Sequence, residues 1–170
     1  MKKSLLFMVG VFLVMMLAAC GASDEDAQAI KEKVHQYSVD NFDGNVTASI
    51  TSHELIVNEN GAETSFSLPD EEFFVSIAPF VEETHPCAIH SLTGCQGELV
   101  EKEFKVYIED EDGNKVVDET MTSLANGFID LWLPRDETFH VTIEHDEKMA
   151  EAEISTYEGD NTCITGMQLL

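Results

Sequence analysis

The second half of the chain alternates short apolar runs with turn residues, and this pattern restricts the fold more than any other feature of the sequence. Turns are expected at 110–114, where the sequence reads Asp-Glu-Asp-Gly-Asn, and at Asn126-Gly127. Short strands separated by turn signals about every ten residues are typical of antiparallel sandwiches. We therefore predict a C-terminal antiparallel β-sandwich over residues 98–170. Its expected strands cover 104–109, 115–121, 128–133, 139–144, 149–156 and 162–170.

The segment before this sandwich is predicted to be a small α+β region. Apolar residues at helical spacing predict an amphipathic helix from Asp24 to Asp40. Strand-like alternation follows over 46–57 and 64–68, and Asn60-Gly61 between these runs is a strong hairpin signal. The apolar and aromatic run from Phe73 to Phe80 is typical of a buried strand. The predicted fold class is therefore mainly β, with an N-terminal helix.

The chain opens with a pattern typical of an exported protein. Lys2 and Lys3 precede a continuous apolar run over 5–17, which is shorter than the ~20 residues that a membrane span needs. The run ends in Leu-Ala-Ala-Cys, which resembles a bacterial lipobox and predicts lipidation of Cys20. The alternative is an ordinary signal peptide cut near Ala19, with Cys20 as a spare thiol. With the lipobox, the protein is extracytoplasmic and anchored to the cell membrane as a lipoprotein.

These patterns divide the chain into three parts. Residues 1–20 are the predicted signal peptide with its lipobox, 21–97 the α+β region and 98–170 the sandwich. Removing the first part leaves seven Lys and Arg against 33 Asp and Glu, so the formal charge changes from −24 to −26. Such a charge repels nucleic acid, which is excluded as a partner. The charge alone does not predict metal binding.

Three cysteines remain when Cys20 is lipidated, and an odd number cannot all pair in an exported protein. One interpretation is a structural disulfide between Cys87 and Cys95, with Cys163 left free. The other is that all three thiols act together on a soft metal, because thiolate selects Cu(I), Zn(II) or iron–sulfur centres.

Two histidines lie beside the thiols in a segment without apolar periodicity. His85 and His90 are therefore candidate ligands or partners that lower a thiol pKa. The remaining histidines are predicted to be surface residues: His35, His53, His140 and His145. Met167 alternates with Cys163 along the last predicted strand, so it is expected on the same face, although core packing is its favoured role.

The residues around the cysteines also carry a resemblance to a known family. They read Thr-His-Pro-Cys at 84–87, His-Ser-Leu-Thr-Gly-Cys-Gln-Gly-Glu-Leu at 90–99 and Gly-Asp-Asn-Thr-Cys-Ile-Thr at 159–165. This arrangement resembles the CueP family of exported bacterial copper-binding proteins. The resemblance covers essentially the whole chain after the signal peptide.

The resemblance implies a Cu(I) site built from Cys87, Cys95 and Cys163, with His85 and His90 as secondary candidates. Copper, as Cu(I) or also Cu(II), is the implied metal. Zinc is less favoured, because the seven residues between Cys87 and Cys95 exceed the usual zinc spacing. A role in copper resistance or in delivery to an exported cuproprotein is implied as well. Cysteine-driven reduction of Cu(II) to Cu(I) has been proposed for this family.

An alternative hypothesis is a structural or adhesive β-sandwich lipoprotein with a Cys87–Cys95 disulfide and no metal. The stretches 106–113 and 126–134 resemble transthyretin-like and carboxypeptidase-regulatory-like sandwiches, which concerns the fold alone. Neither hypothesis assigns a catalytic residue, since the sequence contains no G-x-S-x-G, H-E-x-x-H or C-x-x-C motif. Whether Cu(II) reduction makes the protein an enzyme stays open. A homodimer is compatible with either hypothesis.

Overall fold

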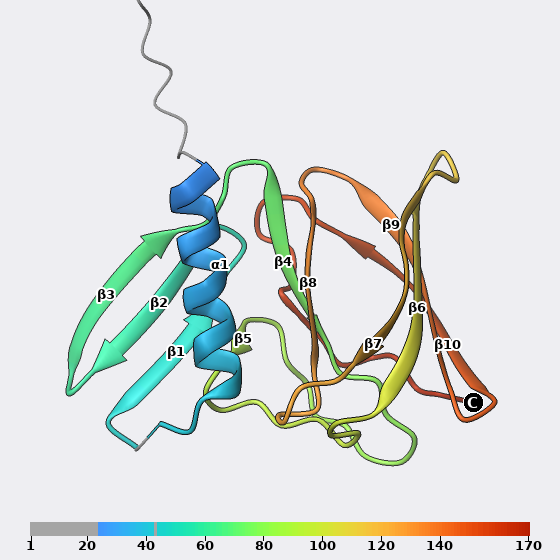
Figure 1. Cartoon of the computed structure of the whole chain (residues 1–170), viewed down its shortest axis with the longest axis horizontal. Helices are drawn as coiled ribbons and strands as arrows, with labels where there is room; N and C mark the ends of the chain where they lie inside the picture. The colour runs from blue at the N-terminus through green and yellow to red at the C-terminus, as the bar shows by residue number, and fades with distance from the viewer. Residues whose placement is uncertain (1–23, 43) are drawn as a thin grey trace, which may run out of the picture.

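The computed structural model of the chain describes residues 24–42 and 44–170. The predicted signal peptide and the predicted lipidation site Cys20 lie outside the described residues. Within them, the chain forms one helix and three sheets, a mainly β fold as predicted (Figure 1). No helix in the described part of the chain is long and apolar enough to cross a bilayer.

The N-terminal helix packs against the first sheet. Helix α1 (Asp24–Val39) confirms the predicted helix, and the first sheet has the strand order β3-β2-β1-β5 (Figure 1). The strands are β1 (Val46–Ile50), β2 (Glu54–Glu59), β3 (Ala62–Ser67) and β5 (His90–Ser91). Val34 and Tyr37 of the helix are buried in a cluster with Leu55 and other apolar residues of the sheet.

The single strand predicted over 46–57 is wrong, because the chain reverses direction between β1 and β2. Thr51 Oγ1 accepts the backbone N–H groups of His53 and Glu54 at 3.4 and 3.1 Å, which closes a local turn. The hairpin predicted at Asn60-Gly61 is confirmed and joins β2 to β3. Its two central residues have φ of 53° and 84°, the left-handed values that a type I′ turn requires.

The sandwich consists of two sheets with a common apolar core. The outer sheet has the order β10-β9-β6-β7, and the central sheet has the order β11-β4-β8. The strands are β4 (Glu72–Ile77), β6 (Glu103–Asp110), β7 (Lys115–Thr122), β8 (Ile129–Pro134), β9 (Thr138–His145), β10 (Lys148–Ser155) and β11 (Cys163–Ile164). All pairs are antiparallel except β11–β4, which is parallel. Strand β11 covers only Cys163–Ile164, so it is much shorter than the strand predicted over 162–170.

Strand β4 is buried on both faces, which explains the continuous apolar run in this segment. Its odd-numbered residues from Phe73 to Ile77 belong to the sandwich core, while Phe74 packs with the helix cluster. Ser76 is the direct partner of Asp130 in the β4–β8 pairing. Because side chains alternate along a strand, both residues lie on the face opposite the sandwich core. The candidate site forms on this face.

The predicted division of the chain at residue 97 stays a prediction. Strand β4 from the first part pairs with β8 from the second, and β11 pairs with β4. The central sheet therefore contains strands from both sides of that point.

Candidate metal centre

Three thiols and one imidazole meet where β5 of the first sheet approaches β11 of the central sheet. The ligand atoms of Cys87, His90, Cys95 and Cys163 all lie within 4.8 Å of one another. The Cys87 and Cys95 sulfurs are 3.6 Å apart, and Cys163 Sγ lies 3.4 Å from His90 Nδ1. The fold thus brings together all three cysteines that the sequence analysis singled out.

The three cysteines are free thiols. The 3.6 Å between the Cys87 and Cys95 sulfurs exceeds the ~2.05 Å of a disulfide bond, yet a small movement would allow oxidation to join them. Cys163 packs with Ala78 and Phe128, and both other cysteines pack against this group. A structural disulfide alone does not explain why a third thiol and a buried imidazole gather at the same point.

Tight backbone packing holds Cys95 in place. The Cys95 N–H donates to Ser91 O at 2.9 Å, so that 91–95 forms a compact turn. Gly94 lies within this turn, and a Cβ there would come within 2.7 Å of Ser91 Oγ. Beyond the turn, a Cβ on Gly97 would lie 2.6 Å from the Gly127 carbonyl oxygen. Glycine is therefore required where this loop meets the turn before β8.

Thr162 connects the segment of Cys163 to the first sheet. Its buried hydroxyl donates to Ile50 O at 2.6 Å and accepts the His90 N–H at 3.0 Å. The N–H groups of Thr162 and Cys163 both donate to Ala88 O, at 3.0 and 3.2 Å. A single threonine hydroxyl therefore fixes β11 relative to both β1 and β5.

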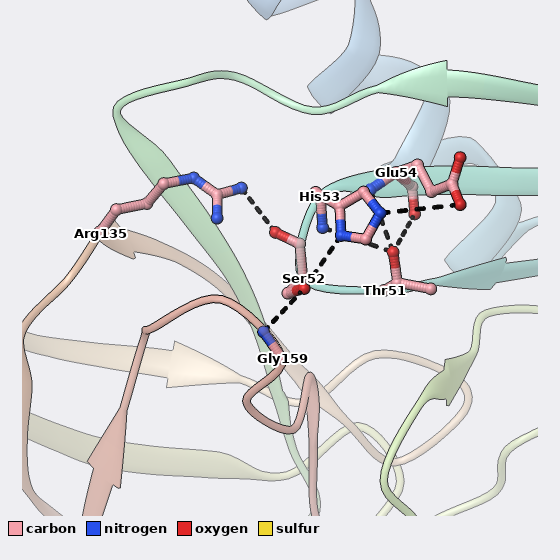
Figure 2. Close-up of polar contacts among 6 residues, drawn as sticks. All are labelled: Thr51, Ser52, His53, Glu54, Arg135 and Gly159. Atoms are coloured by element: carbon pink, nitrogen blue, oxygen red, sulfur yellow. Dashed lines mark hydrogen bonds and ion pairs between the residues drawn. The ribbon is translucent and has the colours of Figure 1, made fainter.

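The turn between β1 and β2 anchors the loop that leads to Thr162. Figure 2 shows Arg135 pointing toward this turn, where its Nη2 donates to Ser52 O at 2.6 Å. From the loop before β11, the Gly159 N–H donates to Ser52 Oγ at 3.2 Å. His53, with Nδ1 3.1 Å from Ser52 Oγ, is exposed in this turn and is not part of the thiol cluster.

The thiols of the cluster differ in their tendency to ionise. The pKa of Cys95 is lowered, chiefly by hydrogen bonding with Cys163, with further lowering by His90 and His85. The same hydrogen bond raises the pKa of Cys163, as does its burial, and burial raises the pKa of Cys87. Cys95 can therefore offer a thiolate, whereas a metal held by all three sulfurs must displace protons from the other two.

The two candidate histidines occupy different environments. His90 is fully buried, its ring centroid is 4.5 Å from that of Phe128, and it belongs to the cluster. His85 is half-buried, and its ring centroid is 6.4 Å from that of Phe128. It affects the pKa of Cys95 but is not among the four clustered groups. The fold thus distinguishes two histidines that looked equivalent in the sequence.

Of the four histidines predicted to be surface residues, three are confirmed as exposed and His145 is not. His35, His53 and His140 are exposed, while His145 is half-buried with Nδ1 2.7 Å from Glu103 O. Met167 packs in the sandwich core, as its favoured role predicted. The expectation that it shares a face with Cys163 is wrong, because regular strand geometry ends at Ile164 and Cys163 packs in a separate cluster.

Sequence reasoning missed several residues that shape this site. Thr162, Ser76, Asp130 and Phe128 each contact a clustered group or a neighbour of one. Ser76 gave one usable signal, because a serine within an otherwise apolar run is buried only with a hydrogen-bond partner. Nothing in the sequence indicated that this partner would be Asp130, which is 54 positions away in the sequence although its strand is next to β4 in the sheet.

A donor set of three sulfurs and one imidazole nitrogen fits a soft metal ion, and Cu(I) and Zn(II) both accept these ligands. The low exposure of His90 and Cys163 keeps water away from half of the cluster.

Comparisons with known proteins agree with this chemistry. The family model of CueP, described as "Periplasmic copper-binding protein CueP", matches residues 29–168. The crystal structure of S.CueP is similar, with a TM-score of 0.79 and 34% sequence identity, covering 88% of this chain and 99% of that chain. No curated protein matches the chain significantly. The chain therefore belongs to the CueP family of periplasmic copper-binding proteins.

Proposed function

We propose that this protein holds one Cu(I) ion with the sulfurs of Cys87, Cys95 and Cys163, and that His90 supplies a fourth ligand. The observation that carries the proposal is the convergence of three sulfurs and one imidazole nitrogen within 4.8 Å. Thiolates are soft ligands that select Cu(I) over hard cations. His85 stands outside this group, and its role is to favour the thiolate of Cys95.

Zinc is the competing metal, since three thiolates and an imidazole also form a tetrahedral zinc site. Membership in a copper-binding family favours copper. Affinities measured for both metals under the same conditions distinguish the two, and tighter binding of zinc would contradict the proposal.

Reduction of Cu(II) is a second part of the proposal. Two thiols that join in a disulfide release two electrons and two protons, which convert two Cu(II) ions to Cu(I). Cys87 and Cys95 are the suitable pair, because their sulfurs are only 3.6 Å apart. After this oxidation only Cys163 and His90 remain of the four donors, so the three-sulfur Cu(I) site exists only while Cys87 and Cys95 are reduced. Formation of one disulfide for every two Cu(I) ions produced is the expected stoichiometry.

The proposed location follows from the N-terminal sequence. A lipid on Cys20 would anchor the domain at the outer side of the cell membrane, where the protein would sequester copper or pass it to an exported cuproprotein. The test is metabolic labelling with a fatty acid analogue, which should label the wild-type protein and not the Cys20→Ser variant. Equal labelling of both would contradict the anchor.

The copper site is tested with the chain from Gly21 onward, which contains every element described above. Cu(I) affinity is measured in competition with a Cu(I)-specific chelator, without oxygen. Cys87→Ser, Cys95→Ser and Cys163→Ser should each weaken binding at least tenfold. His140→Gln, which changes an exposed histidine on β9, is the matched control and should leave the affinity unchanged. Unchanged binding in any of the three cysteine variants would remove that sulfur from the site.

A further inference from the structure

A row of polar side chains leads from the thiol cluster into the protein on the inner face of the central sheet. Cys163 is the register partner of Ser76 on β4, and Ser76 is the register partner of Asp130 on β8. Direct partners in a sheet place their side chains on the same face. His90 approaches this row from the facing sheet, with Nδ1 3.4 Å from Cys163 Sγ and Nε2 3.3 Å from Ser76 Oγ.

The hydrogen bonds of Asp130 fix the direction of this row. Ser76 Oγ donates to Asp130 Oδ1 at 2.6 Å, and Ser38 Oγ donates to Asp130 Oδ2 at 2.7 Å. A serine hydroxyl carries a single proton, so Ser76 has none left for His90. The contact between Ser76 and His90 is therefore a hydrogen bond only when Nε2 carries the proton and donates it.

No ion pair explains Asp130. Among residues 24–42 and 44–170, no basic side chain forms an ion pair with this partly buried carboxylate. Burying part of a carboxylate without a cation beside it costs free energy. One of its two hydroxyl partners is Ser38 near the end of α1, and the other is the serine that contacts His90. The contact with Ser38 connects helix α1 to β8, whereas the contact with Ser76 leads to His90 in the thiol cluster.

We propose that Asp130, acting through Ser76, keeps the proton of His90 on Nε2 and thereby presents Nδ1 to the metal. Asp130 and Ser76 are positioning residues that do not touch the ion. A metal-bound histidine commonly donates its other ring N–H to a carboxylate or another acceptor, which fixes the ring orientation. Here a serine hydroxyl is inserted between the ring and the carboxylate.

This inference rests on the proposed function, but its first test does not need copper. Nitrogen NMR of the metal-free chain from Gly21 onward, at a pH where exposed histidines are neutral, locates the ring proton of His90. The expected result is a proton on Nε2 in the parent chain and a mixture of tautomers in Ser76→Ala and Asp130→Asn. Ser38→Ala is the matched control, because it removes the other hydroxyl partner of Asp130, and it should keep the Nε2 proton.

The second readout is Cu(I) affinity against a competing chelator. Ser76→Ala and Asp130→Asn should each weaken binding about tenfold, while Ser38→Ala should change it less than twofold. Circular dichroism and melting temperature confirm that each variant is folded. An unprotonated Nε2 in the parent chain would overturn the inference, as would unchanged tautomer and affinity in both folded variants. If the Nε2 proton is found but the parent chain binds no copper, the proposed function fails while the positioning of His90 stands.

Discussion

The hydroxyl of Thr162 donates a hydrogen bond to the carbonyl oxygen of Ile50 at 2.6 Å, and this contact joins the last strand of the fold to the first. The same hydroxyl accepts the His90 N–H, so β1, β5 and β11 meet at one side chain. Because Cys163 is the next residue, the position of its sulfur relative to the other thiols depends on this junction.

Replacing Thr162 with valine should destabilise the protein by about 1–3 kcal/mol. The substitution keeps the shape but removes the hydroxyl that bonds both the Ile50 carbonyl and the His90 N–H. Chemical denaturation measures the change in the free energy of unfolding. Thr120→Val, on the exposed side of β7, is the matched control and should stay within about 0.5 kcal/mol of the parent. Equal stability of both variants would show that the junction contributes nothing.

Adding a methyl group at Gly97 should disturb the loop that carries Cys95. The new Cβ would lie 2.6 Å from the Gly127 carbonyl oxygen, so the two segments must separate. We expect Gly97→Ala to cost about 1–3 kcal/mol of stability and to lower the Cu(I) affinity. Gly44→Ala provides the control, because no atom lies within 4 Å of a Cβ built there. A Gly97→Ala variant with parental melting temperature and affinity would contradict the close packing.

The two histidines beside the thiols should respond differently to substitution. His90→Gln removes a group of the cluster and should weaken Cu(I) binding about tenfold or more. His85→Gln removes a residue at the rim and should have a smaller effect on affinity. Chelator competition on both variants gives the comparison. A larger loss in His85→Gln than in His90→Gln would reverse the assignment of the fourth ligand.

The reactivity of Cys95 should persist when the pH is lowered. Its pKa lies below the ordinary value, so the thiolate remains as the pH falls through the range in which a free thiol, with a pKa of ~8.5, becomes protonated. Alkylation with iodoacetamide, followed by mass spectrometry, should label Cys95 before the other two cysteines at a pH of about 6. Cys87 and Cys163 should react slowly there, because the pKa of each is raised. Preferential labelling of Cys163 would reverse this order.

Glu98 should control the order of the loop before Cys87. Its Oε2 accepts the N–H groups of Val81, Glu82 and Glu83 at 2.9, 3.0 and 3.0 Å. The bond from Glu83 is the largest cause of the lowered pKa of Glu98, so the protection is present above the ordinary carboxyl pKa and is lost as the pH falls through the lowered value.

The Glu98→Gln variant should accordingly exchange these three backbone amide protons faster than the parent, as measured by hydrogen exchange near neutral pH. Glu119→Gln, a change on the exposed strand β7, should leave the three rates unchanged. Identical rates in the parent and in Glu98→Gln would show that the carboxylate does not order the loop.

Local signals in the sequence correctly predicted much of the fold. The Asn60-Gly61 dipeptide predicted a hairpin because its residues tolerate the left-handed conformation, and the structure has that hairpin. The run 46–57 was misinterpreted because alternation alone does not reveal a reversal, which here depends on hydrogen bonds to the Thr51 side chain.

The site was only partly predictable for a different reason. The cysteines stood out by their number and their neighbours, but the choice between His85 and His90 depends on which residue enters β5 and turns inward. Ser76 and Asp130 are 54 positions apart and meet only through the β4–β8 pairing. Such contacts arise from tertiary structure and leave no local signal in a single sequence.

The most direct test of the central claim is a count of reactive thiols in the reduced chain from Gly21 onward, titrated with Cu(I) without oxygen. After each addition, the cysteines are alkylated and identified by mass spectrometry. The account predicts that Cys87, Cys95 and Cys163 become protected together and that protection is complete at one Cu(I) per chain. If Cu(I) binds while any of the three stays fully reactive, or if all three remain reactive, the three-thiol copper site is contradicted.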